Sequence, residues 1–182
     1  MMDRALATIA RRIRLLASRA VVRMINDAGG LQVVQITLLA DETRDQVERF
    51  QNYGLTSHPH PGAEAVAVAL GASRDHLVAI AVDDRRYRIK GLAAGEVALY
   101  DDLGHMVRLT RAGIVIDGAG RPVTVTNTSK LRVESPLLEV TGEIKDQCDG
   151  AGKTMAVMRA TYNGHTHPGD SGGTTGTPNQ GM

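Results

Sequence analysis

The sequence contains few large aromatic side chains. Among its 182 residues there are no tryptophans, one phenylalanine and four tyrosines. Large aromatics dominate many hydrophobic cores, so we expect a core of valine, isoleucine, leucine and alanine instead. Barrels that bind single-stranded nucleic acid use aromatic side chains as stacking platforms, and this sequence lacks such platforms. The 20 glycines predict many tight turns.

Cysteine pairs, long apolar runs and a signal peptide are also missing. Cys148 is the only cysteine, so one chain cannot form an internal disulfide, and nothing indicates a secreted, disulfide-rich fold. The longest apolar run, residues 65–70, is far shorter than the roughly 20 residues of a membrane-spanning helix. Arginines interrupt the first 14 residues and exclude a signal-peptide core. We therefore expect a soluble protein made in a reducing compartment.

The sequence has no excess of charge of one sign. Its 21 basic residues nearly balance its 20 acidic residues. A protein that binds nucleic acid through phosphate contacts is usually more basic. The balance therefore predicts no nucleic-acid partner.

Residues 3–19 have the period of an amphipathic helix. Leu6, Ile9, Ile13 and Leu16 recur at helical spacing, and arginines lie largely between them. We expect this helix to pack on its own domain or on a neighbouring subunit. A basic helix on a membrane surface is the alternative, but the apolar stripe is narrow for that role.

Residues 20–101 predict a small β-barrel. Residues 41–52 are charged, have no clear period and predict a solvated loop or a short helix. Short strands separated by turn residues at this spacing suit a closed barrel of the oligosaccharide/oligonucleotide-binding (OB) kind. The six expected strands cover residues 20–25, 31–39, 63–70, 77–82, 87–92 and 96–100.

One His-x-His sequence lies inside this predicted barrel. His58 and His60 are each followed by a proline, and prolines prevent regular strand pairing. We expect a surface loop here, exposed to solvent or in contact with a partner, and we place no metal in it.

From residue 107 a short repeat begins. Pairs of apolar residues, separated by one residue, alternate with turn-forming segments. Each pair predicts one short strand with both apolar side chains on the same face. The pairs are Val107/Leu109, Ile114/Ile116, Val123/Val125, Leu131/Val133 and Leu138/Val140.

Strands this short bury too little apolar surface within one chain. The economical arrangement is three identical chains wound about one axis, with the short strands as faces of a triangular prism and the apolar pairs inside. This arrangement also hides the strand edges. We therefore predict a homotrimer with a three-chain β-helix over residues 102–164. Residues 141–162 would continue the repeat imperfectly or form a different last segment.

Residues 165–182 predict a metal-binding tip and a polar tail. His165 and His167 lie two positions apart in a glycine-rich segment, so in an extended chain their side chains would point to one side. Three chains would supply six imidazoles, which favours an octahedral iron over a tetrahedral zinc. A closed shell indicates a structural ion rather than a catalytic one. In one chain alone, the pair indicates only a turn with two exposed histidines. The tail, residues 171–182, is either disordered or folded back as a polar cap.

The sequence resembles the central spike proteins of contractile phage tails, most closely the baseplate assembly protein V family of Mu-like phages. The resemblance covers essentially the whole chain and is most specific in residues 83–101 and in the His-x-His tail. It implies a homotrimer whose OB-fold domain attaches to the hub of the tail baseplate. It also implies a C-terminal three-chain β-helix whose point holds iron through His165 and His167. The motifs that carry it are Lys-Gly-Leu at 90–92, Gly-Glu-Val at 95–97, Tyr-Asp at 100–101 and Gly-His-Thr-His-Pro-Gly-Asp-Ser-Gly-Gly-Thr-Thr at 164–175.

The resemblance implies a protein that is made in the host cytoplasm, resides at the tail tip of the virion and pierces the host outer membrane when the sheath contracts. Some family members also hold calcium and chloride ions within the helix, and no motif here assigns ligands for these ions. The sequence contains no lysozyme-like domain and no catalytic constellation. We therefore expect no enzymatic activity and no small-molecule substrate.

Other functions stay open from the sequence. A trimeric fibre could bind a surface glycan, and the spike could belong to a phage-derived injection device. A metalloenzyme could use His165, His167 and Asp170 as a two-histidine, one-carboxylate iron site. These three residues fall within six positions of a glycine-rich tail, which offers no enclosing pocket for a substrate.

Overall fold

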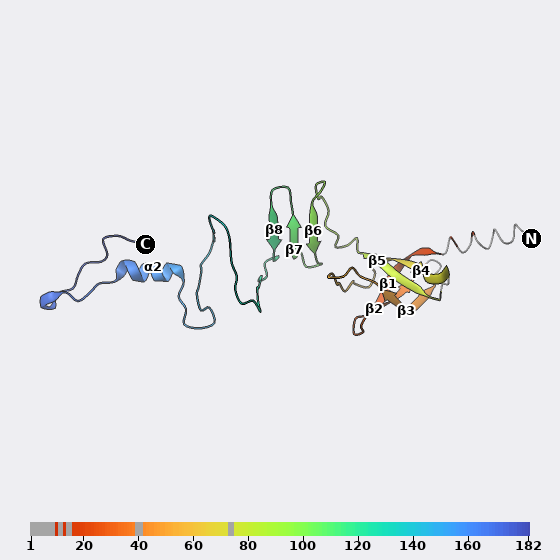
Figure 1. Ribbon diagram of the computed structural model, residues 1–182, viewed down its shortest axis with the longest axis horizontal. Coiled ribbons are helices and arrows are strands. Elements are labelled where there is room, and N and C mark those ends of the chain that lie inside the picture. The colour runs from red at the N-terminus through yellow and green to blue at the C-terminus, as the bar shows by residue number, and fades with distance from the viewer. Residues whose placement is uncertain (1–9, 11–12, 14–15, 39–41, 73–74) are drawn as a thin grey trace, which may run out of the picture. The chain divides into compact units, whose positions relative to one another are not determined.

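A computed structural model describes residues 10, 13, 16–38, 42–72 and 75–182. The chain divides into two compact units, Met1–Thr124 and Val125–Met182. The first unit contains a five-stranded barrel and a three-stranded sheet, and the second contains one α-helix (Figure 1). Within the described residues, no helix has both the length and the apolar character needed to cross a bilayer.

Five strands close the barrel in the order β1-β2-β3-β5-β4. All neighbouring strands pair antiparallel except β3 and β5, which are parallel. A closed barrel leaves no lateral strand edge unpaired. The expected small barrel is therefore confirmed, with five strands instead of six. The elements are β1 (Ala17–Asn26), β2 (Gln32–Thr37), β3 (Thr43–Arg49), β4 (Glu64–Ala69), the 3-10 turn η2 (Leu70–Ala72) and β5 (Leu77–Asp83).

The barrel core is aliphatic, as its composition predicted. Burial alternates along β2, in which every second residue points inward. Val22, Val34 and Ile36 are the largest fully buried side chains. Four alanines spaced two apart, from Ala63 to Ala69, face the same core, and their small size lets the strands of a narrow barrel close.

The predicted N-terminal helix, residues 3–19, lies mostly outside the described residues. Its last three residues belong instead to β1, where Ala17 and Arg19 pair with Val68 and Val66 of β4. Strand pairing at the barrel closure therefore overrides the helical period at this end.

The interpretation of residues 41–52 as a loop or helix was wrong, because Thr43–Arg49 forms β3. Only one inward position of this strand is apolar, Val47, and the next inward position is Arg49. A strand with a buried arginine lacks the apolar alternation that marks a strand in the sequence.

The predicted strand at residues 87–92 was also wrong, because a turn covers residues 85–87 and residues 88–92 form no strand. The backbone N–H groups of Tyr87 and Arg88 both donate to the carbonyl oxygen of Asp84, each at 3.1 Å. The Asp84 carboxylate accepts from the backbone N–H of Arg86 at 3.0 Å. A side chain that caps the turn in this way competes with strand pairing.

The second sheet contains β6 (Val97–Tyr100), β7 (Met106–Leu109) and β8 (Ile114–Asp117), in that order and all antiparallel. Figure 1 draws the three strands side by side. The sequence placed residues 96–100 in the barrel. This assignment was wrong, because β6 pairs with β7 in the second sheet and not with the barrel strands. β7 and β8 coincide with the first two pairs of the repeat.

Residues 118–154 contain no strand in this single chain, and one isolated bridge joins Lys145 to Thr154. Helix α2 (Met155–Gly164) follows, and the 3-10 turn η3 (Asp170–Gly172) lies in the tail. The expectation of a β-helix up to residue 164 is therefore corrected for its last ten residues, which are helical. Thr154 caps α2 by accepting a hydrogen bond from the Val157 backbone N–H at 3.2 Å.

Candidate functional site

The sheet β6-β7-β8 carries one continuous apolar face. The strand register places Val97, Leu109 and Ile114 in one row across the three strands. Leu99, Val107 and Ile116 form the next row. All six are exposed large hydrophobics, and Ile114 is 71% exposed. Large apolar patches are uncommon on a soluble monomer and mark an interaction surface.

The residues between these apolar positions lie on the opposite face of the sheet. Ala98, Arg108 and Val115 form one row across it. Arg108 donates to the Glu96 carboxylate at 2.7 Å. This ion pair holds the pKa of Glu96 below its usual 4.5, together with the backbone N–H of Ala93. The two faces of the sheet therefore differ in polarity.

The later apolar pairs of the repeat are also exposed. Their exposed fractions run from 48% at Val140 to 70% at Leu131. Among the described residues these positions form no strand pairs, and about half or more of each side chain stays exposed. The exposed positions are Val123, Val125, Leu131, Val133, Leu138 and Val140.

Helix α2 ends directly at the predicted metal ligands. The backbone N–H of His165 donates to the carbonyl oxygen of Tyr162 at 3.3 Å and closes the helix. Met155, Met158 and Tyr162 lie three and four residues apart on this helix and are each about 40% exposed. Two sequence signals predict this helix: the capping residue Thr154 and the helical spacing of Met155, Met158 and Tyr162. They were overlooked because these residues were assigned to the end of the β-helix.

The rings of His165 and His167 lie next to each other, with centroids 4.9 Å apart and an edge-to-face angle of 89°. The Nδ1 atom of His165 lies 2.5 Å from the Tyr162 carbonyl oxygen. A carbonyl can only accept a hydrogen bond, so Nδ1 carries the proton and Nε2 keeps its lone pair. Histidines that bind metals usually donate their other ring N–H in this way.

The tail folds back beside the histidines. The Thr175 backbone N–H donates to the carbonyl oxygen of His167 at 2.9 Å. The His167 backbone N–H donates to the Thr175 hydroxyl, also at 2.9 Å. Pro168 and Thr174 form a bridge around the turn η3. Of the two alternatives for this tail, the structure therefore has the folded-back one.

The end of the chain returns to helix α2. The backbone N–H of Met182 donates to the Asn163 side-chain oxygen at 2.9 Å. The Asn163 amide donates in turn to the Met182 carbonyl oxygen at 3.3 Å. These contacts place the chain terminus beside the residues that precede His165.

One chain supplies two imidazoles to this site. Among the described residues, no group of three or more histidine, cysteine, aspartate or glutamate side chains is arranged to hold a metal ion. Asp170 is exposed and does not join His165 and His167 in such a group. Among the described residues, the two histidines therefore do not belong to a three-ligand site within one chain.

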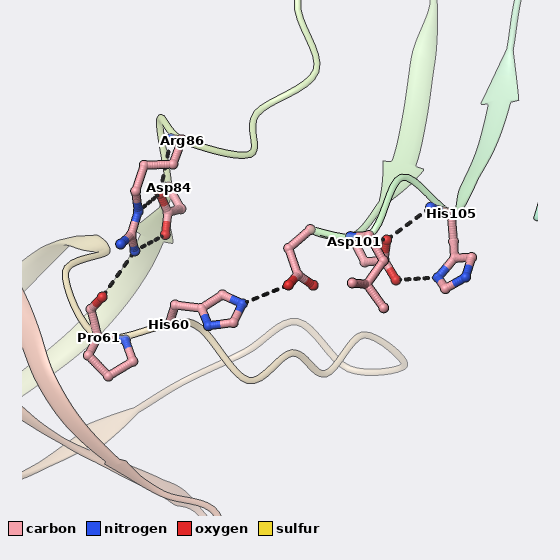
Figure 2. Close-up of polar contacts among 8 residues, drawn as sticks. His60, Pro61, Asp84, Arg86, Asp101 and His105 are labelled. Atoms are coloured by element: carbon pink, nitrogen blue, oxygen red, sulfur yellow. Dashed lines mark hydrogen bonds and ion pairs between the residues drawn. The ribbon is translucent and has the colours of Figure 1, made fainter. Parts of the chain in front are cut away.

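The other His-x-His sequence has a different role. Figure 2 shows His60 pointing toward the turn after β6, and its Nε2 lies 3.1 Å from an Asp102 carboxylate oxygen. His60 also packs against Tyr87, with ring centroids 5.2 Å apart, and both His58 and His60 are exposed to solvent. The expected surface loop is confirmed. Through His60 and Asp102, this loop of the barrel contacts the turn that follows β6 in the second sheet.

Charged pairs flank this junction on both sides (Figure 2). The Arg86 guanidinium donates to the Asp84 carboxylate at 2.6 Å and to the Pro61 carbonyl oxygen at 3.0 Å. It thereby holds the pKa of Asp84 below its usual value. The hydrogen bond from His105 lowers the pKa of Asp101 in the same way. The family resemblance is most specific in residues 83–101, but the sequence alone does not predict these contacts.

Comparisons with known proteins agree with one another. Residues 19–86 match the family described as "Bacteriophage Mu Gp45, N-terminal". The chain is 41% identical over 188 residues to the baseplate puncturing device gp45 of Escherichia phage Mu, which covers 96% of this chain and 94% of that protein. It is 42% identical over 147 residues to the Mu-like prophage FluMu protein gp45 of Haemophilus influenzae, which covers 78% of this chain and 80% of that protein.

Proposed function

This chain belongs to the family of phage Mu gp45, and we propose that it forms the homotrimeric spike of a contractile phage tail. The family resemblance expected from the sequence is thus confirmed. The protein has a structural role in a phage baseplate, which places it in the virion tail. In the proposal, its N-terminal region attaches to the hub of the baseplate, and its histidine tip leads through the host outer membrane.

The observation that carries the proposal is the exposed apolar face of β6-β7-β8. With the pairs from Val123 to Val140, each chain offers twelve large apolar side chains whose exposed fractions run from 38% to 71%. Burying one such side chain fully contributes roughly 1.5–3 kcal/mol. Over three chains this driving force exceeds the roughly 4–15 kcal/mol that each association step costs in lost freedom of motion.

Three copies also complete the histidine site. The two imidazoles of one chain become six at a threefold axis, which matches an octahedral iron ion. Within the proposal, Nε2 of His165 is one ligand atom, because Nδ1 is occupied by Tyr162. The bound ion would tie three chain ends together. Six protein ligands would leave no position for a substrate. Calcium and chloride sites inside the helix would lie between chains, and their ligands are unassigned.

The piercing role extends the name of the phage Mu relative, a puncturing device, to this chain. Residues 163–182 contain small and polar side chains around the histidines and no large apolar side chain except Met182. Interwound chains cannot separate one at a time, so such a spike resists unfolding kinetically. These properties suit a stiff point that passes through a membrane without remaining in it.

The experiment that tests the proposal measures mass and metal content of the full chain together. Native mass spectrometry should give three chains per particle, and elemental analysis should give about one iron per three chains. A monomer without bound metal would remove both supports of the proposal.

A further inference from the structure

The barrel carries an apolar surface that the function described above does not use. Phe50, Leu55 and Ile80, here called the barrel patch, line a surface cavity of about 400 Å³ together with Leu99. Each of these four side chains is more than half exposed. They come from the loop after β3, from β5 and from β6. Three segments of the chain thus place four large apolar side chains around one opening.

The backbone directs Ile80 outward. In β4 and β5, Val66 pairs with Ala81 and the next residue, Ala67, pairs with Ala79. Ile80 is therefore the extra residue of a β-bulge, a feature that redirects a side chain out of the regular alternation. Its side chain is 55% exposed, while the neighbouring Ala79 is fully buried.

The loop that carries Phe50 and Leu55 is held in place from inside the barrel. The buried Arg49 guanidinium donates to the Ser57 carbonyl oxygen at 2.6 Å and to the Ser57 hydroxyl at 2.8 Å. It also donates to the Gln32 side-chain oxygen at 2.6 Å. Gln51 accepts from the Ser57 backbone N–H at 2.8 Å. The loop is fixed before anything covers it, and a preformed surface costs less ordering on association.

Leu99 connects the barrel patch to the apolar sheet face. Its side chain lines the cavity beside Phe50 and Ile80. It also lines a second cavity of about 460 Å³ with Val107, Ile116 and Val123. The apolar side chains of the sheet face and those of the barrel patch therefore meet at Leu99.

We propose that a second copy of this chain covers the barrel patch, so that contact between chains continues from the sheet onto the barrel. The inference rests on the proposed trimer, because the chain that would cover the barrel patch is the same copy that covers Leu99 in that trimer. Its consequence is that the three barrels are fixed to one another at the base of the spike. The hub would then meet three barrels as one rigid surface.

The test uses the full chain with Cys148→Ser and a single new cysteine in the patch, Leu55→Cys or Ile80→Cys. The matched controls are Met24→Cys and Leu70→Cys, whose native side chains are exposed to a similar extent, 63% and 45%, and do not line this cavity. The probe is a water-soluble maleimide, and the readout is its labelling rate on the purified protein. We expect the patch cysteines to react about tenfold more slowly than the controls, since covered sites react only on local opening.

The mass of each variant is measured in the same samples, which separates the two proposals. If the patch cysteines react as fast as the controls in a trimer, the barrel-patch inference is wrong and the proposed spike stands. If the wild-type chain is a monomer, the spike proposal itself fails. If the patch cysteines become protected only in assembled tails, the occupant is a baseplate protein, and the inference of a second copy is overturned.

Discussion

The Nδ1 atom of His165 donates its hydrogen bond to the carbonyl oxygen of Tyr162, at the last turn of α2. The helix end thereby fixes which ring nitrogen is free to bind a metal. The ring of His167 packs edge-to-face against that of His165. The backbone N–H of His167 donates a hydrogen bond to the Thr175 hydroxyl. Two imidazoles are thus presented by a capped helix and a short hairpin.

Replacement of both tip histidines by alanine, His165→Ala with His167→Ala, should abolish iron binding. The trimer should persist, because the apolar face of the sheet lies elsewhere in the chain. Elemental analysis and native mass measurement check the two parts. The chain provides a matched control in its other His-x-His sequence: His58→Ala with His60→Ala should keep the iron. Loss of iron from the control variant would count against the assignment to the tip.

Neighbouring residues of β8 should respond in opposite ways to the same substitution. Ile116→Asp puts a charge into the proposed apolar contact, and an unpaired buried charge costs several kcal/mol in each copy. We expect this variant to be monomeric. Val115 lies on the opposite face, so Val115→Asp should remain a trimer. Sedimentation velocity distinguishes these states, and equal behaviour of the two variants would contradict the assignment of the faces.

Acid should weaken the second sheet through Glu96. Its carboxylate accepts from Arg108 at 2.7 Å and from the Ala93 backbone N–H at 3.0 Å, and these contacts lower its pKa below 4.5. A lowered folded-state pKa contributes stability that is present above the unfolded value and is lost as the pH falls through the folded value. Amide hydrogen exchange in β6 and β7 should therefore accelerate as the pH falls below about 4.5, after correction for intrinsic exchange.

Glu96→Gln serves as the comparison for this pH dependence. Its amide cannot ionise, so protection in the sheet should be lower than in the wild type at neutral pH and should change little across the same acid range. A variant that kept the wild-type acid response would show that another group controls it.

Truncation of the barrel core should be costly and local. Ile36 is fully buried in β2, and Ile36→Ala should lower the free energy of unfolding of the barrel by about 2–5 kcal/mol. The exposed Met24 provides a comparison, since Met24→Ala should change it by about 0.5 kcal/mol or less. Chemical denaturation followed by circular dichroism measures the difference. Iron content should be unchanged in both variants.

The sequence predicted those parts of the fold in which local signals and packing agree. Both strands of the first hairpin, β1 and β2, have apolar residues where the barrel needs them, and a turn sequence lies between them. Strand β3 was not predicted, because its second inward side chain is Arg49. The partners of Arg49, Gln32 and Ser57, are distant from it in sequence. The wrong strand at 87–92 has strand-like side chains, but Asp84 fixes a turn there.

For the candidate site, the sequence predicted which residues matter better than how they are held. The His165/His167 pair and the apolar repeat were identified from their spacing alone. The contact with the Tyr162 carbonyl depends on the end of α2. That helix was not predicted, because residues 141–162 were interpreted as an imperfect continuation of the repeat or as a different last segment. The barrel patch could not be predicted, because a β-bulge and strand pairing bring its members together.

The central claim is that three copies of this chain share one iron ion at the tip. The most direct measurement is native mass spectrometry of the full chain, purified without chelator, with the iron stoichiometry determined on the same particles. The account predicts particles of three 19.4 kDa chains with one iron each, and iron-free trimers for the His165→Ala, His167→Ala variant. A wild-type monomer, or a trimer whose iron survives the loss of both histidines, would contradict it.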